Sequence, residues 1–168
     1  KTVEEKVAEH KKNLETGSYD KKLEALRLLG YFYKHRQPKL ATAYFEQALE
    51  MAKKENDLKG RAATLTSYGN FLRGQGQIKA PFRYVREALS IYRQLNDTGG
   101  TIDALNIMGS LYNSVDNYSE ALKCLLEALE LCESIDAPGR RAGVQFQLGN
   151  VYLRLSEPEK ARRYFEQL

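Results

Sequence analysis

Apolar residues recur along this chain with the three- and four-residue spacing of amphipathic helices, most clearly between positions 109 and 131. Large residues such as Tyr112 and Leu125 lie at helical spacing, and small residues such as Gly109 and Ala121 would let two helix backbones come close together. We therefore predict two closely packed helices with a polar break between them. A hairpin of this kind cannot bury both of its faces alone, so it needs neighbours.

The same pattern returns at a nearly constant period. Glycines stand at positions 30, 69, 109 and 149, at intervals of 39, 40 and 40 residues. An Ala-Leu pair marks the later helix at positions 48, 88 and 128, and the fourth copy stops before this pair. A large residue follows each glycine after three positions: Tyr33, Leu72, Tyr112 and Tyr152. The period predicts an array of stacked helical hairpins.

These repeats predict an all-α architecture. The first helix of each repeat is expected over about residues 21–35, 60–74, 100–115 and 139–155, with a second helix after each. The array covers 21–168, in repeats of about 21–59, 60–98, 99–138 and 139–168, of which the last is incomplete. Residues 1–16 form a charged amphipathic segment that we interpret as an N-terminal capping helix.

Proline and capping residues suggest where individual helices begin. Pro38 and Pro158 stand where proline favours the first turn of a second helix. In the second repeat, Pro81 stands where the other copies have alanine, and a proline inside a helix would lose a hydrogen bond and clash with the preceding turn. We therefore predict that this helix begins two or three residues later than its counterparts. Asp20 is the predicted N-cap of the first repeat.

The composition is that of an ordinary folded domain, with 42% hydrophobic and 29% charged residues among 168. No apolar run approaches the roughly 18 residues of a membrane span, and the first residues lack the apolar centre of a signal peptide. We expect a cytoplasmic protein that does not contact a membrane. Because residue 1 is not methionine and residue 168 falls within a helical pattern, we also expect this chain to be a piece of a longer polypeptide.

The reactive side chains form no recognisable catalytic or metal-binding group. His10 and His35 have no Cys, His or carboxylate neighbours at ligand spacing, so no metal site is expected. Cys124 and Cys132 lie eight positions apart on one predicted helix, too far for a disulfide, and we interpret them as packing residues. The glycines near position 75 follow a helix rather than a strand, so they do not predict a phosphate loop. We expect neither enzymatic activity nor a cofactor.

The repeated residues resemble the tetratricopeptide repeat family, in a long form of about 40 residues similar to the Leu-Gly-Asn repeats of spindle-orientation scaffolds. The resemblance covers about residues 21–168. The first copy, which is one residue short, carries Leu29, Gly30, Tyr33, Ala41, Phe45 and Ala48, and the third carries Met108, Gly109, Tyr112, Ala121, Leu125 and Ala128. The fourth carries Leu148, Gly149, Tyr152, Ala161 and Phe165, whereas the second departs most, with Leu72, Pro81 and Val85. The family's tryptophan is absent from all four copies.

The resemblance implies a right-handed superhelix whose first helices line a concave groove for extended peptides of partner proteins. Asn70 and Asn150 would hold a peptide backbone, since a carboxamide both donates and accepts hydrogen bonds, and the basic residues of the groove would attract carboxylates. The family's two-carboxylate clamp is not matched, because Tyr31 and Ile107 stand where it needs asparagine. The groove positions hold Arg27, Tyr31, Lys34, His35, Thr66, Asn70, Arg73, Asn106, Ser110, Asn113, Phe146, Asn150 and Arg154.

The leading hypothesis is a protein interaction scaffold or regulatory module that binds an extended, acidic or amphipathic segment of a partner. One alternative is a self-assembling spacer or oligomerisation domain, because the apolar side of Tyr152, Phe165 and Leu168 is expected to be partly uncovered. The other is nucleic-acid binding. It has only the net charge of +4 in its favour, and the basic residues are spread over all helices rather than gathered in one block.

Overall fold

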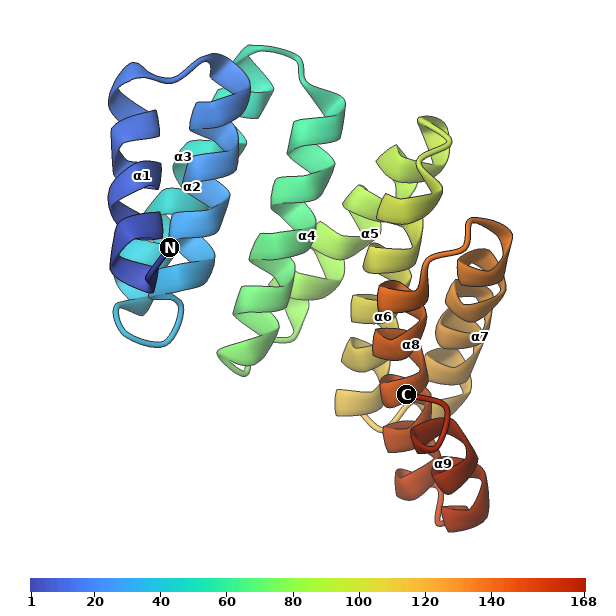
Figure 1. Ribbon diagram of the computed structural model, residues 1–168. Coiled ribbons are helices and arrows are strands. Elements are labelled where there is room, and N and C mark those ends of the chain that lie inside the picture. Colours follow the sequence, from blue (N-terminus) through green and yellow to red (C-terminus); the bar gives the residue numbers. More distant parts are fainter.

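The computed structural model describes all residues from 1 to 168 and contains nine helices joined by short turns (Figure 1). The helices are α1 (Val3–Thr16), α2 (Tyr19–Tyr33), α3 (Pro38–Lys54), α4 (Leu58–Gly74), α5 (Lys79–Gln94), α6 (Thr98–Ser114), α7 (Tyr118–Ser134), α8 (Pro138–Arg154) and α9 (Pro158–Phe165). Each helix packs against the next one along the chain, and no strand is present. The prediction of an all-α solenoid of helical hairpins is confirmed.

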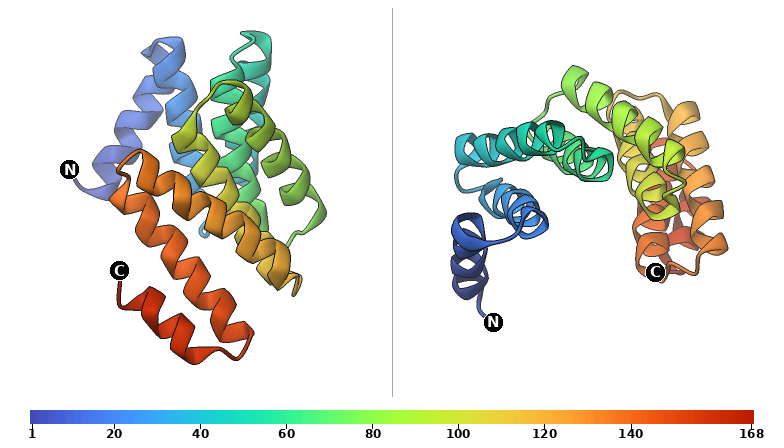
Figure 2. Two further views of the ribbon diagram at one scale, coloured as in Figure 1. Left: turned by 90° about the vertical axis from the view of Figure 1, so that its right-hand side faces the viewer. Right: turned by 90° about the horizontal axis from the view of Figure 1, so that it is seen from above.

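The hairpins stack along an arc. Among the first helices, α2 contacts α4, α4 contacts α6 and α6 contacts α8, whereas α3, α5 and α7 contact only the helices before and after them in the chain. Seen from above, the two ends of the chain lie at opposite ends of the arc, with α5 and α7 on its outer side (Figure 2). The first helices therefore form one continuous inner face, as a groove for an elongated ligand requires.

Polar turns join the helices. In the turns before α4, α6, α7, α8 and α9, one residue adopts the left-handed conformation two positions before the helix, with φ between 47° and 59°, where asparagine and aspartate are favoured among non-glycine residues. Asp57 then caps α4 by accepting a hydrogen bond from the Gly60 amide at 2.8 Å, and Asp97 caps α6 in the same way through Gly100 at 2.9 Å. The left-handed residues are Asn56, Asn96, Asp116, Asp136 and Ser156.

Each repeat places a glycine of its first helix against a side chain of its second helix. A Cβ atom at Gly109 would lie only 2.5 Å from Cγ of Leu125, so α6 and α7 approach as closely as the sequence pattern predicts. Only glycine leaves room for this contact, which explains why it recurs at the repeat period. The corresponding pairs are Gly30 with Phe45, Gly69 with Val85 and Gly149 with Phe165.

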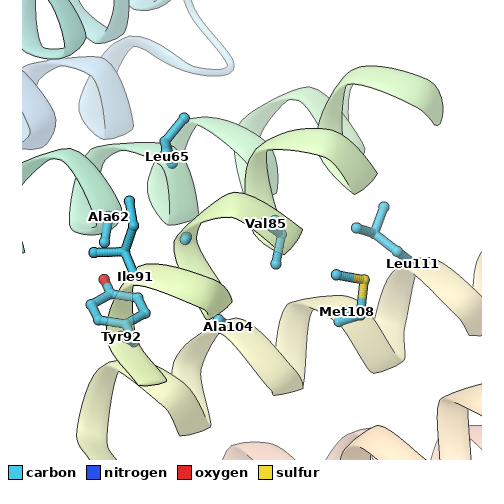
Figure 3. Packing of buried hydrophobic residues seen from close by; sticks show 9 residues of the cluster. Ala62, Leu65, Val85, Ile91, Tyr92, Ala104, Met108 and Leu111 are labelled. Atoms are coloured by element: carbon cyan, nitrogen blue, oxygen red, sulfur yellow. The ribbon is translucent and has the colours of Figure 1, made fainter. Parts of the chain in front are cut away.

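The core is shared between neighbouring repeats. One buried cluster brings together Ala62 and Leu65 of α4, Val85 of α5, and Met108 and Leu111 of α6 (Figure 3). These helices belong to two different hairpins, so neither hairpin buries its apolar faces without the other.

Both cysteines are packing residues, in agreement with the sequence interpretation. Cys132 is buried and Cys124 is half-buried, and neither forms a disulfide. Burial raises the pKa of the Cys124 thiol to about 11 and also raises that of Cys132. The reactive thiolate form is therefore disfavoured at neutral pH.

The second helix of the second repeat begins one residue late, so the predicted delay of two or three residues was wrong. α5 starts at Lys79, whereas α3, α7 and α9 start at the position equivalent to Ile78. The first helical hydrogen bond of α5 runs from the Phe82 amide to the Ile78 carbonyl, at 3.3 Å. Pro81 therefore occupies the third helical position, where no amide has a partner within the helix. A shift of one residue is enough to remove the conflict.

The N-terminal helices also correct one prediction. Ser18, not Asp20, precedes α2, and Asp20 lies in the first turn, where its charge suits the helix dipole. α1 packs against α2 and begins with a capping box, in which the side chains of Thr2 and Glu5 each accept a hydrogen bond from the other residue's amide. Its role as an end cap remains a prediction. None of the nine helices has the length and apolar character needed to cross a membrane.

Candidate functional site

Three neighbouring first helices enclose a cleft of about 470 Å³, here called the inner cleft. Its walls come from the C-terminal end of α2, the second half of α4 and the middle of α6. These segments meet because α2, α4 and α6 pack side by side along the arc. The lining residues are Tyr31, Lys34, His35, Thr66, Ser67, Asn70, Phe71, Arg73, Gly74, Gln75, Asp103, Asn106 and Ile107.

The inner cleft brings together part of the groove predicted from the sequence. The predicted residues in its lining are Tyr31, Lys34, His35, Thr66, Asn70, Arg73 and Asn106. The predicted residues outside it are Arg27, Ser110, Asn113, Phe146, Asn150 and Arg154. The predicted surface is therefore longer than the cleft, which forms its hollow part.

Asn70 and Arg73 form one polar unit in the wall of α4. The Oδ1 atom of Asn70 accepts hydrogen bonds from Nε and Nη2 of Arg73 at 3.3 and 3.0 Å, one helical turn away. The Nδ2 group of Asn70 has no partner within the chain and remains a free donor. Burial lowers the pKa of the Arg73 guanidinium, but arginine keeps its charge at physiological pH. The pair therefore presents a cation and an amide donor to any ligand that carries oxygen acceptors.

The charges around the inner cleft are mainly positive. Lys34 holds its ammonium group 3.6 Å from the centre of the Tyr31 ring, a cation–π contact that leaves the charge uncompensated. Asp103 is the only carboxylate in the lining, and it accepts two hydrogen bonds from Arg140 of α8, at 2.9 and 3.1 Å. Since Arg140 neutralises Asp103, Lys34 and Arg73 give the cleft its charge.

Unpaired polar atoms gather on this face of the molecule. Three buried side-chain atoms have no hydrogen-bond partner in the chain, namely Nε of Arg27, Oδ1 of Asn106 and Oδ1 of Asn113. Leaving such an atom unpaired costs about 1–3 kcal/mol, and folded proteins retain few of them. All three belong to groove residues predicted from the sequence. This face therefore holds three polar groups that no partner within the chain satisfies.

Two predicted groove residues are engaged within the chain. Arg154 donates hydrogen bonds to Asp116 at 2.7 Å and to the hydroxyl oxygen of Tyr118 at 3.3 Å, so it holds the turn between α6 and α7. The hydrogen bond from Tyr118 and that from Arg154 both lower the pKa of Asp116. Thr66 is buried and donates its hydroxyl proton to the Ala62 carbonyl at 2.8 Å. Both side chains contribute more to the shape of the face than to free hydrogen-bonding capacity.

The face continues onto α8 beyond the inner cleft. Asn150 is half-buried, and its side chain forms no hydrogen bond within the chain. Phe146 is 50% exposed, and its ring centre lies 6.0 Å from that of Phe165. α8 therefore adds a free carboxamide and an apolar surface to the polar groups of α4 and α6.

Some lining residues were missed in the sequence analysis: Ser67, Phe71, Gly74, Gln75, Asp103 and Ile107. Ser67 lies one helical turn before Asn70, so extending the predicted stripe by one turn would have found it. Gln75 follows the end of α4, and its Nε2 group reaches the Lys34 carbonyl at 3.4 Å. No local pattern indicates this contact, because it depends on how two repeats pack.

The family model of the tetratricopeptide repeat matches residues 60–134 and again 100–168, which together make up more than half of the chain. The chain therefore belongs to the tetratricopeptide repeat family. Proteins of this family bind protein partners and are generally non-enzymatic scaffolds.

Relatives with repeats of this kind come from distant organisms. Tetratricopeptide repeat protein 19 homolog, mitochondrial, of Drosophila melanogaster is 33% identical over 103 residues, covering 57% of this chain and 27% of that protein. KINESIN LIGHT CHAIN-RELATED 1 of Arabidopsis thaliana is 33% identical over 98 residues, covering 54% of this chain and 16% of that protein. Tetratricopeptide repeat protein 29 of Trypanosoma brucei brucei is 27% identical over 131 residues, covering 76% of this chain and 27% of that protein. The chain thus spans about a quarter or less of these relatives.

Two solved structures share the fold. The crystal structure of BtubC (BKLC) from P. vanneervenii superposes with a TM-score of 0.74 at 18% identity, covering 93% of this chain and 65% of that one. A putative kinesin light chain from Podospora anserina with nearly identical TPR-like repeats gives a TM-score of 0.65 at 17% identity, covering 98% of this chain and 81% of that one. These two likenesses show the fold, and the family match supports a protein–protein interaction scaffold.

Proposed function

We propose that this chain binds an extended, acidic segment of a partner protein along its inner face, with the inner cleft as the central contact. The observation that carries the proposal is the grouping of unpaired polar atoms of Arg27, Asn106 and Asn113 on this face. The uncompensated charges of Lys34 and Arg73 favour carboxylates as the side chains of the ligand.

The inner face matches an extended peptide in chemistry and length. The free Nδ2 donor of Asn70 suits a peptide carbonyl, and the carboxamides of Asn106, Asn113 and Asn150 add both donors and acceptors. Neighbouring helices lie about 8–10 Å apart, and an extended chain rises about 3.3 Å per residue. A ligand that crosses from α2 to α8 therefore needs about eight residues.

Fluorescence anisotropy with defined peptides tests this function. The probe is a labelled glutamate-rich peptide interrupted by prolines, which prevent it from forming a helix. We expect saturable binding that is at least about tenfold tighter than that of the same peptide with lysine in place of glutamate. A lysine peptide that binds equally well would contradict the proposal. A single-stranded oligonucleotide that binds more tightly, with a steep salt dependence, would assign the face to nucleic acid instead.

We also propose that the protein is located in the cytoplasm. The absence of a membrane-spanning helix leaves several compartments open, and one relative is mitochondrial by name. Imaging of the tagged full-length protein tests this point, and accumulation in mitochondria would contradict it.

Exposed apolar residues at the C-terminal end favour self-association as a second candidate function. Leu153 and Leu168 are 51% and 57% exposed, and Tyr152 and Phe165 are half-buried. We expect reversible association in sedimentation velocity at high protein concentration, and we expect Leu153→Lys/Leu168→Lys to abolish it, because a charge opposes the burial of this surface. A wild-type chain that stays monomeric throughout would remove this candidate.

A further inference from the structure

A second hollow, of about 880 Å³, lies on the outer side of the array between α5 and the turn from α6 to α7. We propose that this outer cleft is a docking site for an acidic amphipathic helix of a partner protein. None of its lining residues belongs to the inner cleft. The two sites would therefore allow the chain to hold two different segments at once.

Apolar side chains form the floor of the outer cleft. Ile78 directly precedes α5 and Phe82 lies in its first turn, whereas Tyr112 lies in the last turn of α6 and Val115 directly follows that helix. The rings of Phe82 and Tyr112 meet edge to face, with their centres 5.0 Å apart. Ile78 and Val115 remain 38% and 42% exposed, so an apolar ligand face would cover a surface that now meets water.

A stripe of cations runs beside this floor. Lys79, Arg83 and Arg86 follow one another at intervals of four and three residues, so they lie on one side of α5 over two helical turns. None of them forms an ion pair within the chain. Glu87 is the only carboxylate in the lining, and it pairs with Arg61 of α4. Three uncompensated positive charges beside an apolar floor favour an acidic ligand with an apolar face.

The complete stripe is specific to the second repeat, because the first repeat has a cation only at the position of Lys79, namely Lys39, and the third only at that of Arg83, namely Lys123. Arg86 stands where the first repeat has Glu46 and the third has Leu126. Ser90, also in the lining, stands where both of those repeats have glutamate. The repeat framework alone does not require three cations at these positions, because the first and third copies fold with one.

The spacing of the contacts favours a helix as the ligand. Cations and apolar residues on α5 both recur every three or four residues, and neighbouring side chains at this spacing on a helix are about 5–6 Å apart. Glutamates on a partner helix repeat at the same spacing, and its leucines then face the floor, as in other helix-in-groove interfaces. A nucleic acid would meet the cations but leave Ile78 and Val115 uncovered.

The test uses a labelled helical peptide with leucines along one stripe and glutamates along the next. We expect it to bind saturably and to bind Arg86→Glu/Ser90→Glu at least about tenfold more weakly, because a cation is replaced and two carboxylates are added. Lys123→Glu is the matched control, since Lys123 occupies the position of Arg83 in the third repeat. This control and the inner-face variant Asn70→Ala/Asn150→Ala should bind within about twofold of the wild type.

Several outcomes would overturn the proposal. They are equal binding by Arg86→Glu/Ser90→Glu, equal binding of the lysine-for-glutamate peptide, and equal binding of a peptide whose helix is broken by a central proline. Displacement of the peptide by a single-stranded oligonucleotide at equal concentration would also overturn it. Self-association that is lost in Arg86→Glu/Ser90→Glu would assign the outer cleft to a second copy of the chain instead.

The variants are expected to fold, because each introduces a residue that a neighbouring repeat already carries at the same position. Arg86→Glu and Ser90→Glu introduce the residues that the first repeat carries at the same positions, and Arg86→Leu introduces that of the third. Their thermal unfolding should match the wild type. Arg86→Leu should also bind the helical peptide more weakly. Wild-type affinity in this correctly folded variant would contradict the role of the cation stripe.

Discussion

Gly109→Val is expected to lower the free energy of unfolding by about 3 kcal/mol. A Cβ atom at this position would lie 2.5 Å from Cγ of Leu125 and 2.7 Å from its Cδ2 atom, both much closer than van der Waals contact. Leu125 is fully buried in the cluster between α6, α7 and α8, so it has little room to move. Urea unfolding followed by circular dichroism measures the change.

Two further variants separate the close contact from the general effect of replacing glycine. Gly139→Ala, in the first turn of α8, has no atom within 4 Å of the added Cβ and should be neutral or up to about 1 kcal/mol more stable. Gly109→Val/Leu125→Ala should lose less stability than the sum of its single changes, because the smaller side chain makes room for valine. Additive losses, or a Gly109→Val protein as stable as the wild type, would show that the contact does not govern the packing of the hairpin.

Asn70→Ala/Asn150→Ala is expected to weaken binding of the glutamate-rich peptide by roughly one to two orders of magnitude. Each asparagine would contribute hydrogen bonds to the peptide backbone, and a typical bond contributes about 0.5–1.5 kcal/mol net. The fold should lose about 1 kcal/mol or less, because both side chains are only half-buried and only that of Asn70 makes a hydrogen bond within the chain, to Arg73. Isothermal titration calorimetry measures the affinity for the peptide, and thermal melts of both proteins measure the stability of the fold.

A matched control uses carboxamides outside the groove. Gln47 of α3 and Gln94 of α5 are exposed on second helices, so Gln47→Ala/Gln94→Ala should leave the affinity unchanged. If the asparagine variant binds as tightly as the wild type, the groove assignment fails. If it melts far below the wild type, the asparagines have a structural role.

Most of the fold could be predicted from the repeat period of the sequence. Glycines at positions 30, 69, 109 and 149 recur because each helical hairpin uses the same close contact, and a local pattern of this kind is visible in one sequence. The predicted start of α5 was one or two residues too late, because a proline inside the first helical turn costs no hydrogen bond. A delay of one residue already places Pro81 in the first turn of α5, so the helix does not need to begin any later.

The polar contacts between repeats could not be read from the sequence. Arg154 was placed in the groove by its repeat position, yet it pairs with Asp116, 38 residues earlier. Arg140 likewise neutralises Asp103 across two first helices. Such pairs depend on the stagger and rotation of neighbouring hairpins, and the periodic pattern does not encode either quantity. The hydrogen bonds between Arg73 and Asn70, in contrast, follow from a helical spacing of three and were open to prediction.

A crystal structure of the chain with the glutamate-rich, proline-interrupted peptide tests the central claim most directly. The account predicts an extended peptide along α2, α4, α6 and α8, with a peptide carbonyl accepting a hydrogen bond from Nδ2 of Asn70 and carboxylates near Lys34 and Arg73. A peptide bound only on the outer helices, or on the inner face with its backbone turned away from Asn70, Asn106 and Asn150, would contradict it.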